Sequence, residues 1–207
     1  MYIAIAGNIG SGKTTLTELL SKQYGWTPIY EDPEDNPYLD DFYKDMQRWA
    51  FNLQIHFLHA RYRQILSIQA EAQTVIQDRT IFEDAEIFAS NLQSMGLLSM
   101  RDFTNYMSIY ELIGNIIKAP DLLIYLRASV PTLVKQIQKR GREYESSIRL
   151  DYLSQLNQRY EAWISRYKKS EVMIIDIDRT NFIDNPNDIS MVSDRIDAHI
   201  HGLFPTK

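Results

Sequence analysis

Residues 7–14 have the sequence Gly-Asn-Ile-Gly-Ser-Gly-Lys-Thr, which fits the pattern G-x-x-x-x-G-K-[ST] at every fixed position. An apolar run precedes this segment and a helical pattern follows it, which is the context in which such a segment binds phosphate groups. Its glycines let successive backbone N–H groups converge on phosphate oxygens, and the N-terminus of the following helix adds a positive partial charge. We therefore expect a nucleoside triphosphate here, with Lys13 at the β- and γ-phosphates and the Thr14 hydroxyl on Mg²⁺. The expected loop consists of Gly7, Asn8, Ile9, Gly10, Ser11, Gly12, Lys13, Thr14 and Thr15.

Charged side chains follow the next two apolar runs of the chain. Glu31 ends the second run, and Asp78 and Arg79 follow the third. Glu31 could act as a general base for an acceptor hydroxyl, or it could be a solvated loop acid. Asp78 occupies the place where a second Mg²⁺-linked carboxylate belongs, and Arg79 could keep Glu31 ionised. The alternative for Asp78 and Arg79 is a plain charge pair in a loop.

Short apolar runs alternate with longer amphipathic segments along the chain, and these runs are continuously apolar. That pattern is typical of strands buried on both faces of a parallel sheet. We expect strands at Tyr2–Ala6, Pro28–Glu31, Thr74–Gln77, Leu122–Leu126 and Val172–Ile177. We expect helices at about Lys13–Tyr24, Asp45–Glu71, Phe82–Ser94, Met100–Lys118, Val130–Arg140, Leu150–Lys168 and Asp188–Ile200. The alternation predicts a doubly wound α/β domain spanning residues 1–207, whose ligand lies beyond the carboxyl ends of the strands.

Composition excludes several classes of protein. The 207 residues include 22 Lys and Arg, 27 Asp and Glu and no Cys, with a net charge of −5. A mildly acidic chain does not favour broad nucleic-acid binding, and without cysteine there can be no disulfide or thiolate metal site. A spanning helix needs about 20 apolar residues, and no such run is present. We expect a cytoplasmic protein with no nucleic-acid or membrane partner.

The phosphate loop alone leaves three functions open. A nucleoside kinase needs a base for a neutral hydroxyl, whereas a nucleotide kinase also needs arginines that neutralise an acceptor phosphate. A nucleotide-binding protein that transfers nothing is the third. The Asn-Lys-x-Asp segment with which switch GTPases recognise guanine is not found in the chain.

Several segments, in order and up to about Trp163, resemble deoxynucleoside kinases of the deoxycytidine, deoxyguanosine and deoxyadenosine type, and the bacterial purine branch most. They are residues 7–15, Glu31 with 36–39, and then 43–45, 49–54, 78–80 and 140–145. The resemblance implies the phosphate-loop kinase fold, a five-stranded parallel sheet with helices and a short arginine-containing lid. It also implies transfer of the γ-phosphate of ATP, with Mg²⁺, to the 5′-hydroxyl of a deoxynucleoside.

Catalytic roles follow from this resemblance position by position. Glu31 matches the base for the 5′-hydroxyl, and Asp78, Arg79 and Thr80 match the Glu-Arg-Ser motif of the family. Because Asp is one methylene shorter than Glu, we expect any contact of Asp78 with Mg²⁺ to run through water. Arg140 and Arg142 match the lid arginines that close over the phosphates, although both could be ordinary charges at a helix end.

The resemblance also implies how the acceptor is bound. Tyr43 and Glu145 match the pair that holds the ribose 3′-hydroxyl, Gln54 the glutamine on the base, and Phe88 the aromatic ring stacked on it. Spacing places Gln54 and Arg61 on one helix face, and Asp84 and Phe88 on another.

Arg61 and Asp84 bear on the choice of base. In the thymidine-accepting branch of the family the corresponding positions are small or apolar. An Arg and an Asp there accompany purine or cytosine acceptance; a buried salt bridge without a role in recognition is the alternative. The overall resemblance favours deoxyadenosine, then deoxyguanosine or deoxycytidine.

The two longest expected helices, at about 45–71 and 100–118, carry more apolar surface than one sheet face requires. Together with the assembly usual in the family, this surface leads us to expect a homodimer.

Overall fold

A computed structural model describes residues 1–31, 36–114, 116–200 and 202. Within these residues, five strands form one parallel sheet in the order β2-β3-β1-β4-β5. The carboxyl ends of the strands therefore share one edge of the sheet, where functional loops gather. The strands are β1 (Tyr2–Gly7), β2 (Thr27–Ile29), β3 (Val75–Asp78), β4 (Leu122–Arg127) and β5 (Glu171–Asp176).

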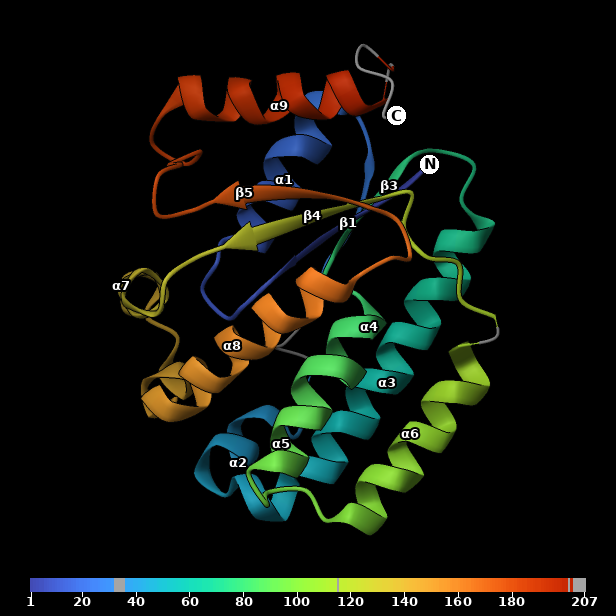
Figure 1. The fold of residues 1–207 in the computed structure, drawn as a ribbon, viewed down its shortest axis with the longest axis vertical. Coiled ribbons are helices and arrows are strands. Elements are labelled where there is room, and N and C mark those ends of the chain that lie inside the picture. Colours follow the sequence, from blue (N-terminus) through green and yellow to red (C-terminus); the bar gives the residue numbers. More distant parts are fainter. Residues whose placement is uncertain (32–35, 115, 201, 203–207) are drawn as a thin grey trace.

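Helices cover both faces of this sheet (Figure 1). One face carries α1 (Lys13–Tyr24), α7 (Val130–Arg140) and α9 (Pro186–Ile200). The other carries α3 (Met46–Ala70), α8 (Leu150–Arg166) and the continuous helical stretch of α4 (Ile81–Glu83), η1 (Asp84–Ala89) and α5 (Ser90–Ser94). Helix α6 (Met100–Gly114) packs along α3, and the short elements α2 (Leu39–Lys44) and η2 (Glu143–Ser147) lie beyond the strand ends.

Alternation along the central strand explains why two layers of helices form. In β1 the side chains of Tyr2, Ala4 and Ala6 belong to the core on the α3 and α8 side. Ile3 and Ile5 belong to the core on the α1 and α9 side. Successive side chains of a strand point to opposite faces, so a strand that is apolar at every position requires a cover on both.

The structure confirms the expected α/β fold, with a few differences in its elements. The boundaries of α1 and α7 match the expected ones. Strand β2 ends at Ile29 rather than at residue 31, so Glu31 lies in the loop beyond the strand. The helix expected over 100–118 ends at Gly114, and residue 115 lies outside the described part. Helix α2 was not predicted, although Asp40 and Asp41 in its first turn are typical of a helix start.

Among the described residues, none of the helices is both long and apolar enough to cross a membrane.

Candidate active site

The phosphate loop runs from the end of β1 into the first turn of α1. Gly10 has a φ of 84°, a left-handed conformation that favours glycine. A Cβ atom at this position would also lie only 2.8 Å from Cγ1 of Ile137 on α7. The Asn8 side chain accepts a hydrogen bond from the Ile9 N–H at 2.8 Å and donates to the Leu153 carbonyl of α8 at 3.2 Å. The loop is therefore fixed by α7 and α8 on both sides.

Lys13 is buried at the start of α1, and its ammonium group lies against the loop. Its Nζ donates to the carbonyl oxygen of Asn8 at 3.0 Å. Burial, and next the positive charge of Arg79, lower the pKa of Lys13 to about 8. A triphosphate in the loop would supply the negative charge that this ammonium group needs.

Thr14, in the first turn of α1, and Asp78, at the end of β3, bring two oxygen-bearing side chains together beside the loop. The Thr14 hydroxyl donates to Oδ2 of Asp78 at 2.5 Å. Oδ1 of Asp78 is buried and has no hydrogen-bond partner among the residues that the structure describes. Hydroxyl and carboxylate oxygens are the ligands that Mg²⁺ prefers, so the unpaired Oδ1 beside Thr14 fits a magnesium site.

Glu31 lies between two arginines. Its Oε1 accepts from Nη2 of Arg61 at 2.9 Å, and its Oε2 accepts from Nε of Arg79 at 3.0 Å. Burial opposes the charge on Glu31, but Arg79 and Arg61 outweigh it and lower its pKa to about 2. The carboxylate is therefore ionised and fixed, with one oxygen on each guanidinium group.

Arg79 is held on several sides. Its Nη1 donates to the Tyr160 hydroxyl at 2.9 Å, and its guanidinium lies 4.4 Å from the centre of the Phe88 ring. Arg79 has a φ of 68°, and it is the only non-glycine residue of the described chain with a positive φ. Strained backbone of this kind gathers at functional sites, where the surrounding contacts hold it.

These groups line one cavity at the strand ends. Every residue expected to be catalytic or to bind Mg²⁺ lines it, as does every expected acceptor contact except Arg61. They are Lys13, Thr14, Glu31, Tyr43, Gln54, Asp78, Arg79, Asp84, Phe88, Arg140, Arg142 and Glu145. Gln54 is buried, and its Oε1 has no hydrogen-bond partner in the described part of the chain, so an amide acceptor remains available inside the cavity.

Arg61 differs from the expectation that it contacts the acceptor. It is buried behind the cavity wall, where its Nε donates to Oδ2 of Asp84 at 3.0 Å and its Nη1 to Gln64 at 3.0 Å. Burial raises the pKa of Asp84 to about 6 against the opposing charge of Arg61. Arg61 thus pairs with two carboxylates that line the cavity, Asp84 and Glu31.

Asp84 and Phe88 lie in a π-helical segment, so the spacing of an α-helix does not describe them. Within η1 the bonds run five residues back, as from Ser90 N–H to the Ala85 carbonyl. Both side chains still reach the cavity. Single π-helical turns of this kind are frequent at functional sites.

The expected lid lies at the end of α7. Gly141, with a φ of 69°, ends this helix. The following element η2 carries Glu145, whose side chain contacts Arg140 in the last turn of α7. Glu145 accepts from Nε of Arg140 at 3.0 Å and also from its Nη2, while Nη1 of Arg142 lies 3.7 Å from Oε1. Both lid arginines are therefore paired with one buried carboxylate.

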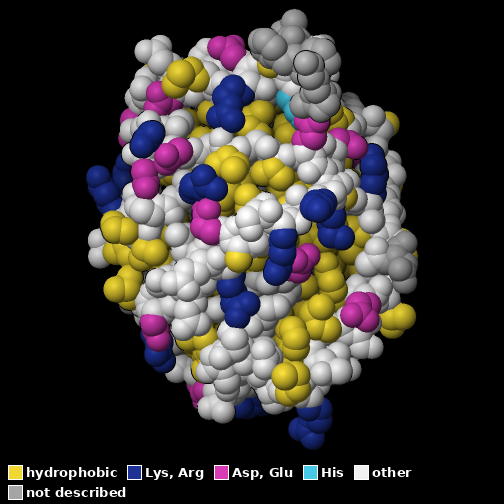
Figure 2. Space-filling model, viewed as in Figure 1, with side chains coloured by type: hydrophobic (Ala, Val, Ile, Leu, Met, Phe, Trp, Pro, Cys, Tyr) yellow, Lys and Arg dark blue, Asp and Glu magenta, His cyan; other side chains and the backbone are white. Residues whose placement is uncertain are grey.

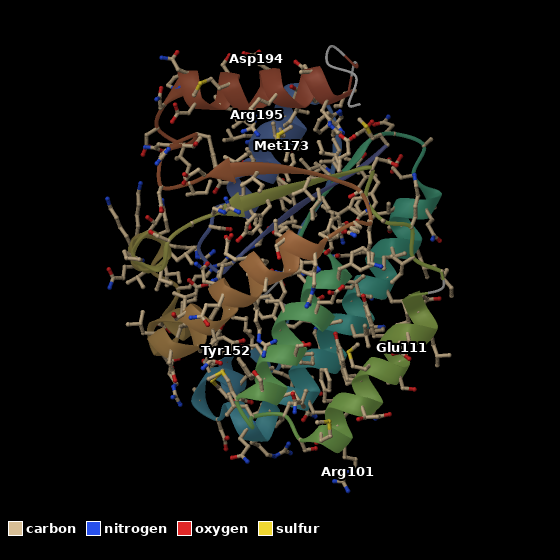
Figure 3. All side chains as sticks on the ribbon, in the orientation of Figure 1. Arg101, Glu111, Tyr152, Met173, Asp194 and Arg195 are labelled. Carbon is tan, nitrogen blue, oxygen red and sulfur yellow. The ribbon has the colours of Figure 1, made fainter. Side chains whose placement is uncertain are left out.

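Aromatic side chains that the sequence did not single out complete the cavity. Tyr144 stacks on Tyr43 with ring centres 6.0 Å apart. Tyr152 projects from α8 toward α2 (Figure 3), where its ring meets Phe42 at 6.4 Å. The spacing of Leu39 and Phe42 on one side of α2 was the available signal for that helix. Tyr152 belongs to the expected helix over 150–168, but only the tertiary structure brings it to the cavity.

A parallel sheet, a phosphate loop at the end of its first strand and an ionised carboxylate across the same cavity define a phosphate-loop kinase. Residues 3–201 match the family model described as deoxynucleoside kinase. The chain therefore belongs to the deoxynucleoside kinase family.

Individual relatives agree with this assignment. The deoxyadenosine/deoxycytidine kinase of Bacillus subtilis is 36% identical over 201 residues, which are 96% of this chain and 93% of the relative. The deoxyguanosine kinase of Bacillus subtilis is 38% identical over 211 residues, or 98% and 97% of the two chains. The solved deoxyadenosine kinase of M. mycoides, with products dCMP and a flexible dCDP bound, is 30% identical with a TM-score of 0.85 and covers 96% of this chain and all of its own.

Proposed function

We propose that this protein transfers the γ-phosphate of ATP to the 5′-hydroxyl of a deoxynucleoside. The observation that supports it most is Glu31, an ionised carboxylate that lines the same cavity as Lys13 and Thr14 of the phosphate loop. A general base must lie close enough to the acceptor to remove its proton. Glu31 lines the cavity together with Arg79, so it can reach an acceptor bound there. The named relatives phosphorylate deoxynucleosides, in keeping with this proposal.

The remaining residues position and neutralise charge, which is most of what phosphoryl transfer requires. Glu31 would accept the proton of the 5′-hydroxyl, and Arg79 would hold Glu31 and the acceptor oxygen in place. Lys13 would bind the β- and γ-phosphates. Arg140 and Arg142 would move from Glu145 to the transferring group, where arginines contribute roughly 10³–10⁵ in rate.

Mg²⁺ would be held by the Thr14 hydroxyl and the Asp78 carboxylate. When bound, it would neutralise the charge that develops on the phosphate oxygens. The unpaired Oδ1 of Asp78 supports this assignment.

We propose a purine deoxynucleoside as the preferred acceptor, deoxyadenosine first, then deoxyguanosine or deoxycytidine. Asp84 can accept a hydrogen bond from an exocyclic amino group, and the Gln54 amide can both donate and accept. Phe88 would stack on the base, and Tyr43 with Glu145 would hold the 3′-hydroxyl. A thymine methyl group would meet Asp84, which disfavours thymidine.

A nucleoside monophosphate as acceptor is the weaker candidate. It would need arginines available for a second phosphate. Among the described residues, each arginine that lines the cavity is paired with a glutamate: Arg79 with Glu31, and Arg140 and Arg142 with Glu145. In the roles proposed above, Arg79 stays on Glu31, and Arg140 and Arg142 turn to the transferring group. This arrangement favours a neutral acceptor.

We also propose a homodimer, formed through α3 and α6. Large apolar side chains are exposed on these helices and just after them, among them Leu66, Ile109, Leu112 and Ile116. In Figure 2 hydrophobic side chains gather in the lower right of the molecule, where Figure 1 places α6.

The cytoplasm remains the proposed location of the protein, on the composition described above.

A competition assay tests the proposed reaction. Purified protein with ATP and Mg²⁺ is given equal amounts of deoxyadenosine, deoxyguanosine, deoxycytidine, thymidine and AMP, and the products are separated by chromatography. We expect a purine deoxynucleoside monophosphate as the main product. Thymidylate as the main product would contradict the proposed role of Asp84, and ADP made from AMP would contradict a neutral acceptor.

Glu31→Gln is the matched variant for this assay. It keeps the size of the side chain but removes the base, so turnover should fall by about 100-fold or more. ATP binding, measured by calorimetry, should persist, because Glu31 does not contact the phosphate loop in the hydrogen bonds described above. Activity within about threefold of the wild type would show that Glu31 is not the base.

A further inference from the structure

Glu83 is a fully buried carboxylate that the roles proposed above do not use. Its Oε1 accepts from the Gly7 N–H at 3.2 Å and from the Tyr160 hydroxyl at 2.9 Å. Its Oε2 accepts from the Thr80 N–H at 2.8 Å and from the Thr80 hydroxyl at 3.2 Å. An ionised carboxylate offers about four acceptor sites and no donor. The four donors around Glu83 therefore suit an ionised carboxylate.

Tyr160 connects this carboxylate to Arg79. Its hydroxyl accepts from Nη1 of Arg79 at 2.9 Å and donates to Glu83. Burial raises the pKa of Tyr160 well above its usual value, so the hydroxyl keeps its proton and can do both. The Arg79 guanidinium is thus held from two sides, by Glu31 through Nε and by Tyr160 through Nη1.

Glu83 also fixes the backbone next to Arg79. Arg79 has a φ of 68°, which costs free energy for a side chain of this size. The following residue, Thr80, donates both its N–H and its hydroxyl to the Glu83 carboxylate, and the two residues form a capping box at the start of α4. Glu83 therefore holds Arg79 in two ways: it binds the backbone next to Arg79 through Thr80, and it binds the Arg79 side chain through Tyr160.

The third connection of Glu83 leads to the phosphate loop. Gly7 is the last residue of β1 and the first of the loop, and its N–H donates to the same Oε1 that accepts from Tyr160. A single oxygen atom thus connects the start of the donor site with the residue that orients Glu31.

We propose that Glu83 and Tyr160 are positioning residues that set the distance between Arg79, and with it Glu31, and the phosphate loop. This inference rests on the proposed function, because it concerns the alignment of the acceptor hydroxyl with the γ-phosphate. Misplacement of reacting groups by about 1 Å can cost about 10²-fold in rate. Glu83 and Tyr160 touch neither substrate in this proposal and act through Arg79 and Gly7.

Tyr160→Phe tests the connection most cleanly, since it removes one hydroxyl and keeps the ring. We expect kcat to fall about tenfold, while the KM for ATP stays within about twofold, because the lost hydrogen bond is to a charged group. The control is Tyr125→Phe. Tyr125 is buried in the same aromatic stack, with its ring 5.9 Å from that of Tyr160, but its hydroxyl donates to Glu161. The kcat of the Tyr125→Phe variant should remain near that of the wild type.

Glu83→Gln provides a second variant and a double-mutant cycle. An amide of the same size places an NH₂ group against two donors, so it disrupts either the Tyr160 side or the Thr80 side. If both residues act through Arg79, the double variant Glu83→Gln with Tyr160→Phe should lose less kcat than the product of the two single losses. Rates are normalised to the fraction of folded protein, counted by the stoichiometry of ATP binding.

The outcomes separate this inference from the proposed function. A wild-type protein that phosphorylates no deoxynucleoside would overturn both. An active wild type in which Tyr160→Phe keeps the kcat of Tyr125→Phe would overturn the positioning role alone. Strictly additive losses in the double variant, or a lowered melting temperature with kcat unchanged, would show a structural role only and would also overturn it.

Discussion

At the scale of single residues, the charge of Lys13 depends on what fills the phosphate loop. In the empty protein, burial and Arg79 lower its pKa to about 8, so a sizeable fraction of Lys13 is neutral at pH 8.5. Phosphate groups favour the charged form and raise the pKa. Binding of ATP should therefore take up a proton at pH 8.5, and much less of one at pH 7, where Lys13 is already mostly charged.

Calorimetry in two buffers with different ionisation enthalpies measures this uptake at pH 8.5. The observed binding enthalpy should differ between the buffers for the wild type. It should not differ for Lys13→Arg, because arginine stays protonated at this pH. Equal enthalpies in both buffers for the wild type would show that Lys13 is fully charged before ATP binds.

Residues that act through a local motif could be predicted from the sequence, and residues that act through tertiary contacts could not. The phosphate loop shows itself by glycine spacing alone, and Glu31 and Arg79 by their places after apolar runs. Thr80-x-x-Glu83 is a capping-box pattern, but the pattern says nothing of Gly7 or Tyr160. Arg61 was placed at the acceptor by resemblance, whereas its burial against Asp84 and Glu31 is visible only in the folded chain.

At the scale of elements, strands and helices with one clear period were predictable and irregular segments were not. Helices α1 and α7 end at Gly25 and Gly141, both in the left-handed conformation, which explains why their limits were found. The π-helical turn η1 has no signature of its own, because its residues are as compatible with an α-helix. The short element η2 lies where a run of charged residues obscures any pattern.

The element η2 allows a prediction about the sugar. Because η2 carries Glu145 into the cavity, Glu145→Gln should weaken recognition of the 3′-hydroxyl. We expect the preference for a deoxynucleoside over its 2′,3′-dideoxy analogue, as a ratio of kcat/KM, to fall about tenfold or more, because a hydrogen bond to a charged group is lost.

Glu143→Gln is the control for that measurement, since Glu143 is an exposed glutamate of the same short element. It should keep the preference of the wild type. If Glu145→Gln keeps it as well, Glu145 does not hold the 3′-hydroxyl, and its pairing with Arg140 and Arg142 would be its main role.

At the scale of the whole molecule, the sequence predicted the alternation of strands and helices but not the order of strands in the sheet. That order follows from pairings between distant segments, such as β1 with β3 and with β4. It brings Glu31, Asp78 and the phosphate loop, which lie far apart in the chain, to neighbouring strand ends. The strand order thus explains how these residues come to share one cavity.

The face formed by α3 and α6 leads to the last prediction. Leu112 is 70% exposed on α6, and Ile116 and Leu66 are exposed beside it. Gln69 of α3 donates to the Ile116 carbonyl at 2.8 Å, so the two helices present one continuous surface. Exposed apolar patches of this kind mark interaction sites. A second copy of the chain would bury the patch and leave the cavity, beyond the strand ends, accessible.

Light scattering should therefore give about 48 kDa, twice the chain mass of 24.2 kDa. Leu112→Glu places a charge in the proposed interface, where it would be buried without a partner, and should shift the mass toward that of the monomer. Met191→Glu is the control, because Met191 is similarly exposed but lies on α9, across the sheet from α6 (Figure 1). A wild-type mass of about 24 kDa, or a dimer that Leu112→Glu leaves intact, would show that this face is not the interface. Since the cavity lies apart from α6, the monomeric variant should still bind ATP.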